Sequence, residues 1–167
     1  EYEQVLNFAK TFLLQNSYSA HKGKESVYSL LYDMNLLFES YVGAYLRKKG
    51  LDVKSQDRGK YLVEEPNLFA LRPDFVLNKA SENEMVLDTK YKNISSQKDI
   101  SQADMYQLYA YATKYEKTHQ LYLIYPKGEL ESLERLSFVR ESLHLDVLFF
   151  DLRQGFEQEI FTPPLPL

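Results

Sequence analysis

Residues 71–93 read LRPDFVLNKASENEMVLDTKYKN and contain two short apolar runs, each accompanied by a carboxylate. The runs belong to two predicted strands, at residues 67–78 and 84–93, and the polar sequence KASEN between them predicts a turn. Residues two apart in a strand share a face. We therefore expect Asp88 and Lys90 to project together, with Leu87 and Thr89 on the other face. The question is why a carboxylate and an ammonium group end an apolar strand beside a second strand that carries Asp74.

The second run predicts a central strand, because residues 85–87 lead into Asp88 without a polar residue. A carboxylate at the end of such a strand costs desolvation free energy unless it has a partner. Lys90 is one partner. If the neighbouring strand brings Asp74 close, the two carboxylates repel each other unless a cation is present. We expect Asp74 and Asp88 to bind Mg²⁺, which prefers oxygen ligands and for which Mn²⁺ can substitute.

The spacing Pro73-Asp74, 13 residues, then Asp88-Thr89-Lys90 is a PD-(D/E)xK pattern. It suits phosphodiester hydrolysis, in which a metal ion polarises the phosphoryl oxygen and activates water. Lys90 would orient that water and offset charge in the transition state. The bare pattern is short and arises by chance in many chains. The alternative is an ordinary Asp–Lys pair at a strand end and an unrelated Pro-Asp turn.

Residues 33–50, DMNLLFESYVGAYLRKKG, predict an amphipathic helix before these strands. Asp33 or Asn35 is the expected cap at its start, and Gly50 is expected to end it. Glu39 lies in this helix, and its periodicity alone leaves two interpretations open. The side chain either supports the metal site or faces solvent.

Residues 99–118 predict a second helix directly after the strands. Gln107 and Tyr111 are four residues apart and share one face of it. They either contact DNA phosphate and brace the site, or form an ordinary polar stripe. Asp104, one turn earlier, has a weaker case for such a role, and the alternative is an exposed side chain.

The remaining chain predicts a helix in residues 1–16, a loop at 17–28, and a hairpin formed by residues 51–56 and 59–65. Further strands are expected at 120–126, 134–140 and 143–152, followed by an irregular tail at 161–167. This order predicts an α/β (α+β) fold, a central mixed sheet flanked by helices. We expect one domain, with residues 1–30 packed on a core of residues 31–167.

The composition of the chain excludes several kinds of functional site. The chain has 167 residues, a net charge of −4 and no cysteine, which excludes disulfides, cysteine-bound zinc and a thiol nucleophile. No apolar run is long enough for a bilayer, so we expect no membrane contact and a cytoplasmic location. The sequence holds no metalloprotease, P-loop or dinucleotide motif. One basic cluster either contacts DNA phosphate or is a solvated surface: Arg47, Lys48, Lys49, Lys54, Arg58 and Lys60.

Four segments, LLFESYV, LRPDFVL, VLDTKYK and DMYQLYAYA, together resemble the C-terminal nuclease domain of the McrC family. McrC is the cleavage subunit of McrBC-type modification-dependent restriction systems, and the resemblance runs from about residue 36 to about residue 126. It implies a restriction-endonuclease-like fold. By this resemblance Asp74, Asp88 and Lys90 fall on the catalytic triad, and Glu39 on a helical acidic position. Gln107 and Tyr111 match the Gln-x-x-x-Tyr motif shared with RecB-like nucleases.

The resemblance also implies partners, namely DNA and a McrB-like AAA+ GTPase motor. The family's amino-terminal half is not found here and the chain starts at Glu1, so we expect a fragment of a longer protein. The motor would then supply most of the DNA affinity that an acidic chain lacks. We expect a Mg²⁺-dependent DNA endonuclease. The alternatives are a RecB-like exonuclease or resolvase without a GTPase partner, and a non-catalytic DNA-binding or assembly module.

Overall fold

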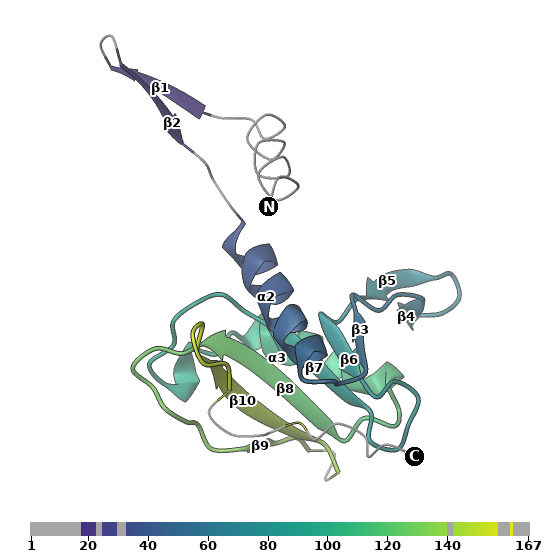
Figure 1. Ribbon diagram of the computed structural model, residues 1–167. Coiled ribbons are helices and arrows are strands. Elements are labelled where there is room, and N and C mark those ends of the chain that lie inside the picture. The colour runs from purple at the N-terminus through teal and green to yellow at the C-terminus, as the bar shows by residue number, and fades with distance from the viewer. Residues whose placement is uncertain (1–17, 23–24, 30–32, 140–141, 157–160, 162–167) are drawn as a thin grey trace. The chain divides into compact units, whose positions relative to one another are not determined.

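The computed structural model describes residues 18–22, 25–29, 33–139, 142–156 and 161 (Figure 1). Chain contacts divide the protein into two units, Glu1–Met34 and Asn35–Leu167. The helix predicted for residues 1–16 and the tail after residue 161 lie outside the described residues. The packing of residues 1–30 on the core stays a prediction.

The described part of the first unit is a hairpin. Strands β1 (Tyr18–Lys22) and β2 (Glu25–Ser29) pair antiparallel, from Tyr18 opposite Ser29 to Lys22 opposite Glu25. The prediction of a loop at residues 17–28 was therefore wrong. Only two residues separate the strands, which is a common hairpin length, and the sequence holds the strand formers Tyr and Val.

The second unit contains a six-stranded mixed sheet with the order β3-β6-β7-β8-β10-β9. The neighbours β3 (Val53–Ser55), β6 (Phe75–Leu77) and β7 (Met85–Thr89) are antiparallel. Strands β7, β8 (Gln120–Pro126) and β10 (His144–Phe150) are parallel, and β9 (Leu136–Ser137) pairs antiparallel with β10. The carboxyl ends of β7, β8 and β10 consequently share one edge of the sheet.

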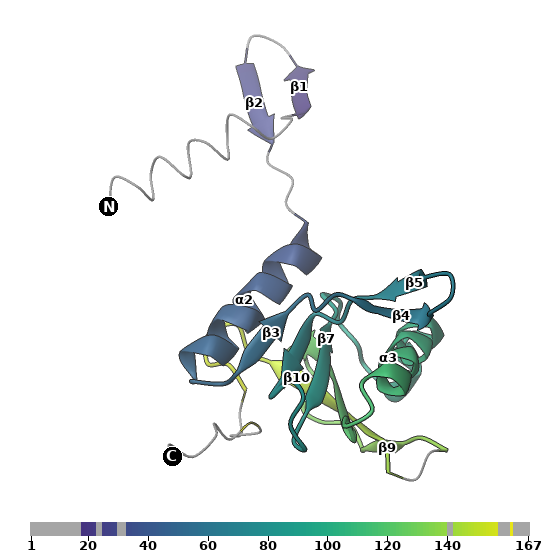
Figure 2. The same ribbon diagram turned by 90° about the vertical axis from the view of Figure 1, so that its right-hand side faces the viewer.

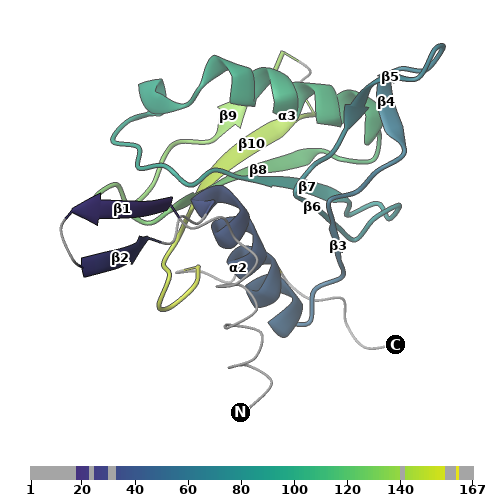
Figure 3. The ribbon, with the colours of Figure 1, turned by 90° about the horizontal axis from the view of Figure 1, so that it is seen from above.

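Helices cover both faces of this sheet, as the sequence predicts. Helix α2 (Met34–Lys48) lies on one face and α3 (Gln102–Lys114) on the other, so that Figure 3 shows three layers. Side chains alternate between two apolar clusters, as strand geometry requires. The α2 cluster includes Phe38, Val42, Leu46, Leu87, Ile124 and Phe150, and the α3 cluster includes Val86, Leu108, Tyr111, Leu123 and Val147.

Helix α2 ends where the sequence predicts. Gly50 has φ of 79°, its N–H donates to the Arg47 carbonyl at 2.9 Å, and Leu51 N–H donates to the Leu46 carbonyl at 3.4 Å. These two bonds form a Schellman motif, for which a left-handed glycine is preferred. The helix begins directly after Asp33, so Asn35 is not its cap. Asn35 Oδ1 instead accepts the N–H of Tyr91 at 3.2 Å.

The prediction of a hairpin formed by residues 51–56 and 59–65 was wrong. The first segment, β3, pairs with β6, whereas β4 (Lys60–Val63) pairs with β5 (Leu68–Leu71) in a separate two-stranded sheet (Figure 2). The single strand predicted at 67–78 is two strands, β5 and β6. Pro73 lies at the break, because proline has no N–H to donate to a strand partner.

Two other elements are shorter than predicted, while β8 and β10 match the prediction closely. Helix α3 starts at Gln102 because Ser101 caps it, with Ser101 Oγ accepting the N–H of Asp104 at 3.2 Å. A short 3₁₀ turn, η1 (Gln97–Asp99), precedes the cap. Strand β9 spans two residues where seven were expected at 134–140.

The contact between α2 and the sheet gives a stability prediction. Gly43 is buried in α2, and a Cβ there would lie 2.8 Å from Cε1 of Phe75. We expect Gly43→Leu to lower Tm by about 4–8 °C through overpacking. Ala44→Leu on the exposed side of the same helix is the matched control, and we expect it to shift Tm by under about 2 °C. Thermal melts followed by circular dichroism measure both, and equal shifts would contradict this packing.

Candidate active site

Asp74 and Asp88 lie side by side because of the antiparallel register of β6 and β7. Phe75 pairs with Leu87, so the preceding residue, Asp74, lies beside Asp88 near the carboxyl end of β7. This end is also the edge at which β8 and β10 finish. The register thus brings together the two carboxylates that are 14 positions apart in the chain.

Asp74 is fixed by Thr89, the last residue of β7. Thr89 donates twice to Asp74 Oδ2, from its backbone N–H at 2.7 Å and from its hydroxyl at 2.6 Å. The backbone carbonyl of Asp74 accepts the N–H of Gln56 at 2.8 Å. Within the described residues no hydrogen bond reaches Asp74 Oδ1, so this oxygen is available to a further ligand.

Asp88 is a buried carboxylate with an incomplete set of partners. The residue is 2% exposed, and its Oδ2 lies 2.6 Å from Lys90 Nζ in an ion pair. That contact lacks hydrogen-bond geometry, and no other donor in the described part of the chain reaches Oδ2. Burial raises the pKa of Asp88 to about 7, with added repulsion from Asp74 and Asp104, although Lys90 opposes the shift. The negative charge of Asp88 is therefore costly, and in the metal-free protein it is complete only above about pH 7.

Lys90 connects the end of β7 to α3. Its Nζ lies 3.8 Å from Asp104 Oδ1 and donates to Gln107 Oε1 at 3.2 Å, in addition to the Asp88 contact. Burial opposes the charge of Lys90, but the neighbouring carboxylates, Asp88 above all, outweigh burial and raise its pKa. The ammonium group therefore stays protonated at neutral pH and is not a free base.

Gln107 and Tyr111 continue this chain of contacts to the other side of the site. Gln107 Nε2 donates to the Tyr111 hydroxyl at 2.8 Å, and that hydroxyl donates to the Arg72 carbonyl at 3.0 Å. Arg72 is two residues before Asp74. The pair thus links Lys90 to the segment that carries Asp74, which is the geometry of a brace. Contact of Gln107 or Tyr111 with DNA phosphate stays a prediction.

Glu39 lies on the α2 side of the sheet. Its Oε1 accepts a hydrogen bond from Gln56 Nε2. Burial raises the pKa of Glu39, the Gln56 bond opposes this shift, and the charge of Asp74 adds to it. Gln56 also donates its backbone N–H to the Asp74 carbonyl and so connects Glu39 to the segment that carries Asp74. Asp88 and Lys90 instead contact the α3 side. Among residues 18–22, 25–29, 33–139, 142–156 and 161, no three His, Asp or Glu side chains gather closely enough to hold a metal ion.

Asp104 is not exposed, which excludes the solvent-facing alternative for this residue. Its side chain is 14% exposed and lies 3.8 Å from Lys90 Nζ and 3.5 Å from Lys92 Nζ. The Ser101 cap places Asp104 in the first turn of α3, where a carboxylate is favoured by the helix dipole. Sequence reasoning missed Lys92, whose Nζ also lies 5.6 Å from the Tyr125 ring centre. Two features of the sequence could have indicated this pair: the acidic residue in the first turn of α3 and the second lysine after β7.

The fold and this site define an α/β protein with two carboxylates and a lysine at one edge of a mixed sheet. The family model of the McrBC 5-methylcytosine restriction system component matches residues 1–126. The chain belongs to this family, which confirms the resemblance found in the sequence.

Among solved structures, one match is a chain of the refined half-complex from the tetradecameric assembly of Thermococcus gammatolerans McrB AAA+ hexamers with bound McrC. It has a TM-score of 0.59 at 20% identity and covers 74% of this chain. The match spans 30% of that chain's own length. The likeness supports the α/β fold. No curated protein matches this chain. Within the described residues, no helix has the length and apolar character needed to cross a membrane.

The buried charge of Asp88 gives a pH-dependent stability prediction. The folded pKa of about 7 exceeds the reference value of 3.8, so the destabilising charge is absent below about pH 4 and complete above about pH 7. We expect Asp88→Asn to stabilise the metal-free protein at pH 8 by up to about 4 kcal/mol. The gain should shrink as the pH falls toward 4.

Urea unfolding of both proteins across this pH range measures the effect. Asp52→Asn is the control, because Asp52 is exposed and the same chemical change there should leave stability nearly unaltered. A loss of stability in Asp88→Asn at pH 8 would show instead that the ion pair with Lys90 outweighs the cost of burial.

Proposed function

We propose that this protein is a metal-dependent DNA endonuclease domain of the PD-(D/E)xK type, the cleavage subunit of a McrBC-like, GTP-dependent and modification-dependent restriction system. One observation carries the proposal. Asp88 is buried, its Oδ2 has Lys90 as its one ionic partner in the described part of the chain, and Asp74 lies beside it. Two such carboxylates fit a hard divalent cation.

The oxygens of Asp74 and Asp88 would hold Mg²⁺, with Mn²⁺ as a substitute. When bound there, the metal supplies Lewis-acid polarisation of a phosphoryl oxygen and activation of water. Thr89 orients Asp74 through two hydrogen bonds, so this ligand needs no rearrangement. Glu39, on the α2 side next to Asp74, would support the site through water or metal.

Lys90 has a separate role from the metal ligands. Its raised pKa keeps a proton and a positive charge at Nζ. It would orient the attacking water and offset the charge that develops on the phosphate. Gln107 holds Lys90 in place, and Tyr111 connects Gln107 to the backbone before Asp74. Such bracing is expected where a small displacement of a catalytic group is costly.

A motor partner completes the proposal. The similar solved chain comes from an assembly of McrB AAA+ hexamers with bound McrC. A net charge of −4 is unfavourable for unaided DNA binding, because phosphate contacts dominate affinity. We therefore assign most of the DNA affinity, and the GTP requirement, to a McrB-like AAA+ GTPase. A RecB-like exonuclease or resolvase would cleave without GTP, and a non-catalytic module would not cleave at all.

Cleavage by the assembled system tests the catalytic assignment. We expect Asp74→Asn and Asp88→Asn, each combined with the motor subunit, GTP and methylated DNA, to reduce the cleavage rate by at least about 100-fold. Asp52→Asn should retain the wild-type rate. Circular dichroism would show that all three variants are folded. Wild-type cleavage by Asp88→Asn would refute the site, and cleavage without GTP would favour the exonuclease alternative.

Metal binding can be measured without catalysis. We expect millimolar Mn²⁺ to raise Tm by several degrees, and to raise it more at pH 8 than at pH 6. The reason is that folded Asp88 holds a proton below its pKa of about 7, and the metal must displace that proton. Asp88→Asn should lose the shift. An equal shift in that variant would place the metal elsewhere.

A further inference from the structure

A second feature of the sheet edge is a basic groove that the catalytic assignment does not use. The cavity has a volume of about 620 Å³ and lies between the last turns of α2 and the loop after β10. Its lining contains three cationic residues, Lys48, Lys49 and Arg153, and no carboxylate. Cationic residues are thus concentrated in this groove, although the chain as a whole has more acidic than basic residues.

The groove has a packed floor. The Tyr45 ring packs against the Phe150 ring with centres 5.2 Å apart. The hydroxyl of Tyr41 donates to the Leu152 carbonyl at 2.9 Å. Gly155 has φ of 86°, and a Cβ there would lie 2.2 Å from Cε2 of Tyr45. The loop and α2 are therefore in close contact, which brings Lys48, Lys49 and Arg153 to the lining of one groove.

Within the described part of the chain, no ion pair involves Lys48, Lys49 or Arg153. The charge of Arg153 does help to lower the pKa of the nearby Asp151 carboxyl. The carboxylate of Asp151, in the same loop, accepts the N–H groups of Arg153 and Gln154 at 2.7 and 3.0 Å and so closes the turn. Lysines in the last turn of a helix also favour its dipole. That explanation does not apply to Arg153, which lies outside the helix.

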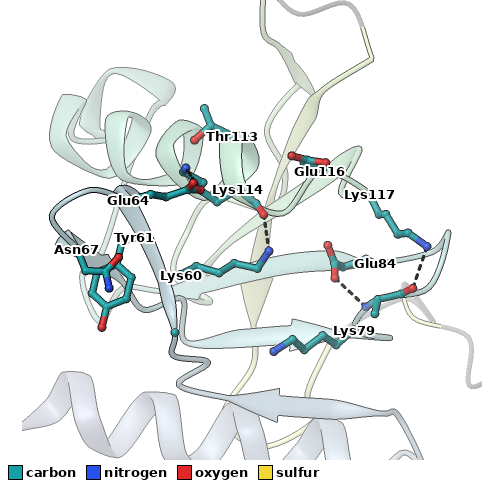
Figure 4. Close-up of a pocket in the computed structure, with 12 residues that line it drawn as sticks. Lys60, Tyr61, Glu64, Asn67, Lys79, Glu84, Thr113, Lys114, Glu116 and Lys117 are labelled. Carbon is teal, nitrogen blue, oxygen red and sulfur yellow. Dashed lines mark hydrogen bonds and ion pairs between the residues drawn. The ribbon is translucent and has the colours of Figure 1, made fainter.

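A second cavity provides a contrast. It has a volume of about 630 Å³ and is also rich in lysine (Figure 4). There, however, the lysines have partners in the protein. Lys79 pairs with Asp57 at 2.7 Å, Lys114 with Glu64 at 2.7 Å, and Lys117 with Glu82 at 2.9 Å. Lysine content alone therefore does not distinguish the groove, whereas the lack of ion pairs within the described residues does.

The groove and the candidate active site share one edge of the sheet. Phe150 ends β10 and Thr89 ends β7, with β8 between these parallel strands (Figure 3). Two strand spacings correspond to about 10 Å. One DNA strand advances about 3.4 Å per nucleotide. One DNA strand would cross from the end of β7 to the end of β10, where the groove begins, in about three nucleotides.

We propose that Lys48, Lys49 and Arg153 bind the phosphodiester backbone of the DNA strand that is cleaved. This inference rests on the proposed nuclease function and adds a substrate contact to it. The bound chemistry is a chain of regularly spaced phosphates, which a groove with three cations and no acidic lining attracts. The groove contributes affinity and register for the strand, and the carboxylates near β7 contribute cleavage.

The test compares two triple variants of the full chain with equal changes in charge and composition. The groove variant is Lys48→Gln, Lys49→Gln and Arg153→Gln. The control variant is Lys98→Gln, Lys117→Gln and Arg135→Gln, whose side chains are exposed and lie outside both the groove lining and the basic cluster at residues 47–60. Fluorescence anisotropy of a labelled DNA oligonucleotide gives Kd in EDTA, at about 20 to 200 mM salt. Melting curves establish that both variants are folded.

We expect the groove variant to weaken DNA binding by at least about 10-fold at low salt, and to reduce the slope of log K against log salt by about 2 to 3. The control should change Kd by under about 2-fold. Equal effects of the two variants, undetectable DNA binding by the wild type, or equal competition by polyglutamate would overturn the proposal.

The groove proposal and the nuclease proposal can be refuted independently of each other. The groove variant should retain the Tm rise with Mn²⁺, because its three substitutions lie outside the carboxylate site. Unchanged binding by the groove variant, with cleavage lost in Asp88→Asn, would refute the groove alone. Cleavage retained by Asp88→Asn would refute the catalytic site, whatever the groove variant does.

Discussion

The two hydrogen bonds from Thr89 to Asp74 are the contacts on which the candidate site depends, because they join the end of β7 to the residue that precedes β6. They hold the Asp74 carboxylate next to Asp88, and Asp88 itself is buried in the sheet. The antiparallel register of β6 and β7 makes this approach a property of the fold. Strand alternation then places Lys90 on the same face as Asp88, toward α3.

This arrangement concentrates opposing electrostatic effects at one edge of the sheet. Burial and Asp74 raise the pKa of Asp88, while Lys90 stabilises its charged form. Gln107 and Tyr111 hold Lys90 on the α3 side, and Glu39 lies on the α2 side near Asp74. We expect this edge to be less stable than an uncharged one, as is common at functional sites. A divalent cation between the carboxylates would remove the conflict, and this is the main physical argument for the proposed nuclease.

Local patterns predicted the parts of the fold that depend on local geometry. Strand alternation indicated that Asp88 and Lys90 share a face, and Gly50 indicated the end of α2. Strand pairing could not be predicted from local patterns, because β3 and β6 are distant in the chain and pair only within the folded sheet. Asp104 is buried because α3 packs against the sheet. The sequence of α3 alone does not show which residues that packing covers. The basic cluster at residues 47–60 also divides in space. Lys48 and Lys49 line the groove, whereas Lys60 donates to the last carbonyl of α3, that of Lys114.

The proposed chemistry requires that Asp74 and Asp88 together bind a divalent cation. Anomalous diffraction from crystals of the protein soaked in Mn²⁺ would locate that cation. We expect a manganese peak within coordination distance of one oxygen from each carboxylate, about 2.0–2.3 Å. An occupied manganese site elsewhere in the protein, with Asp88 still paired only to Lys90, would contradict it.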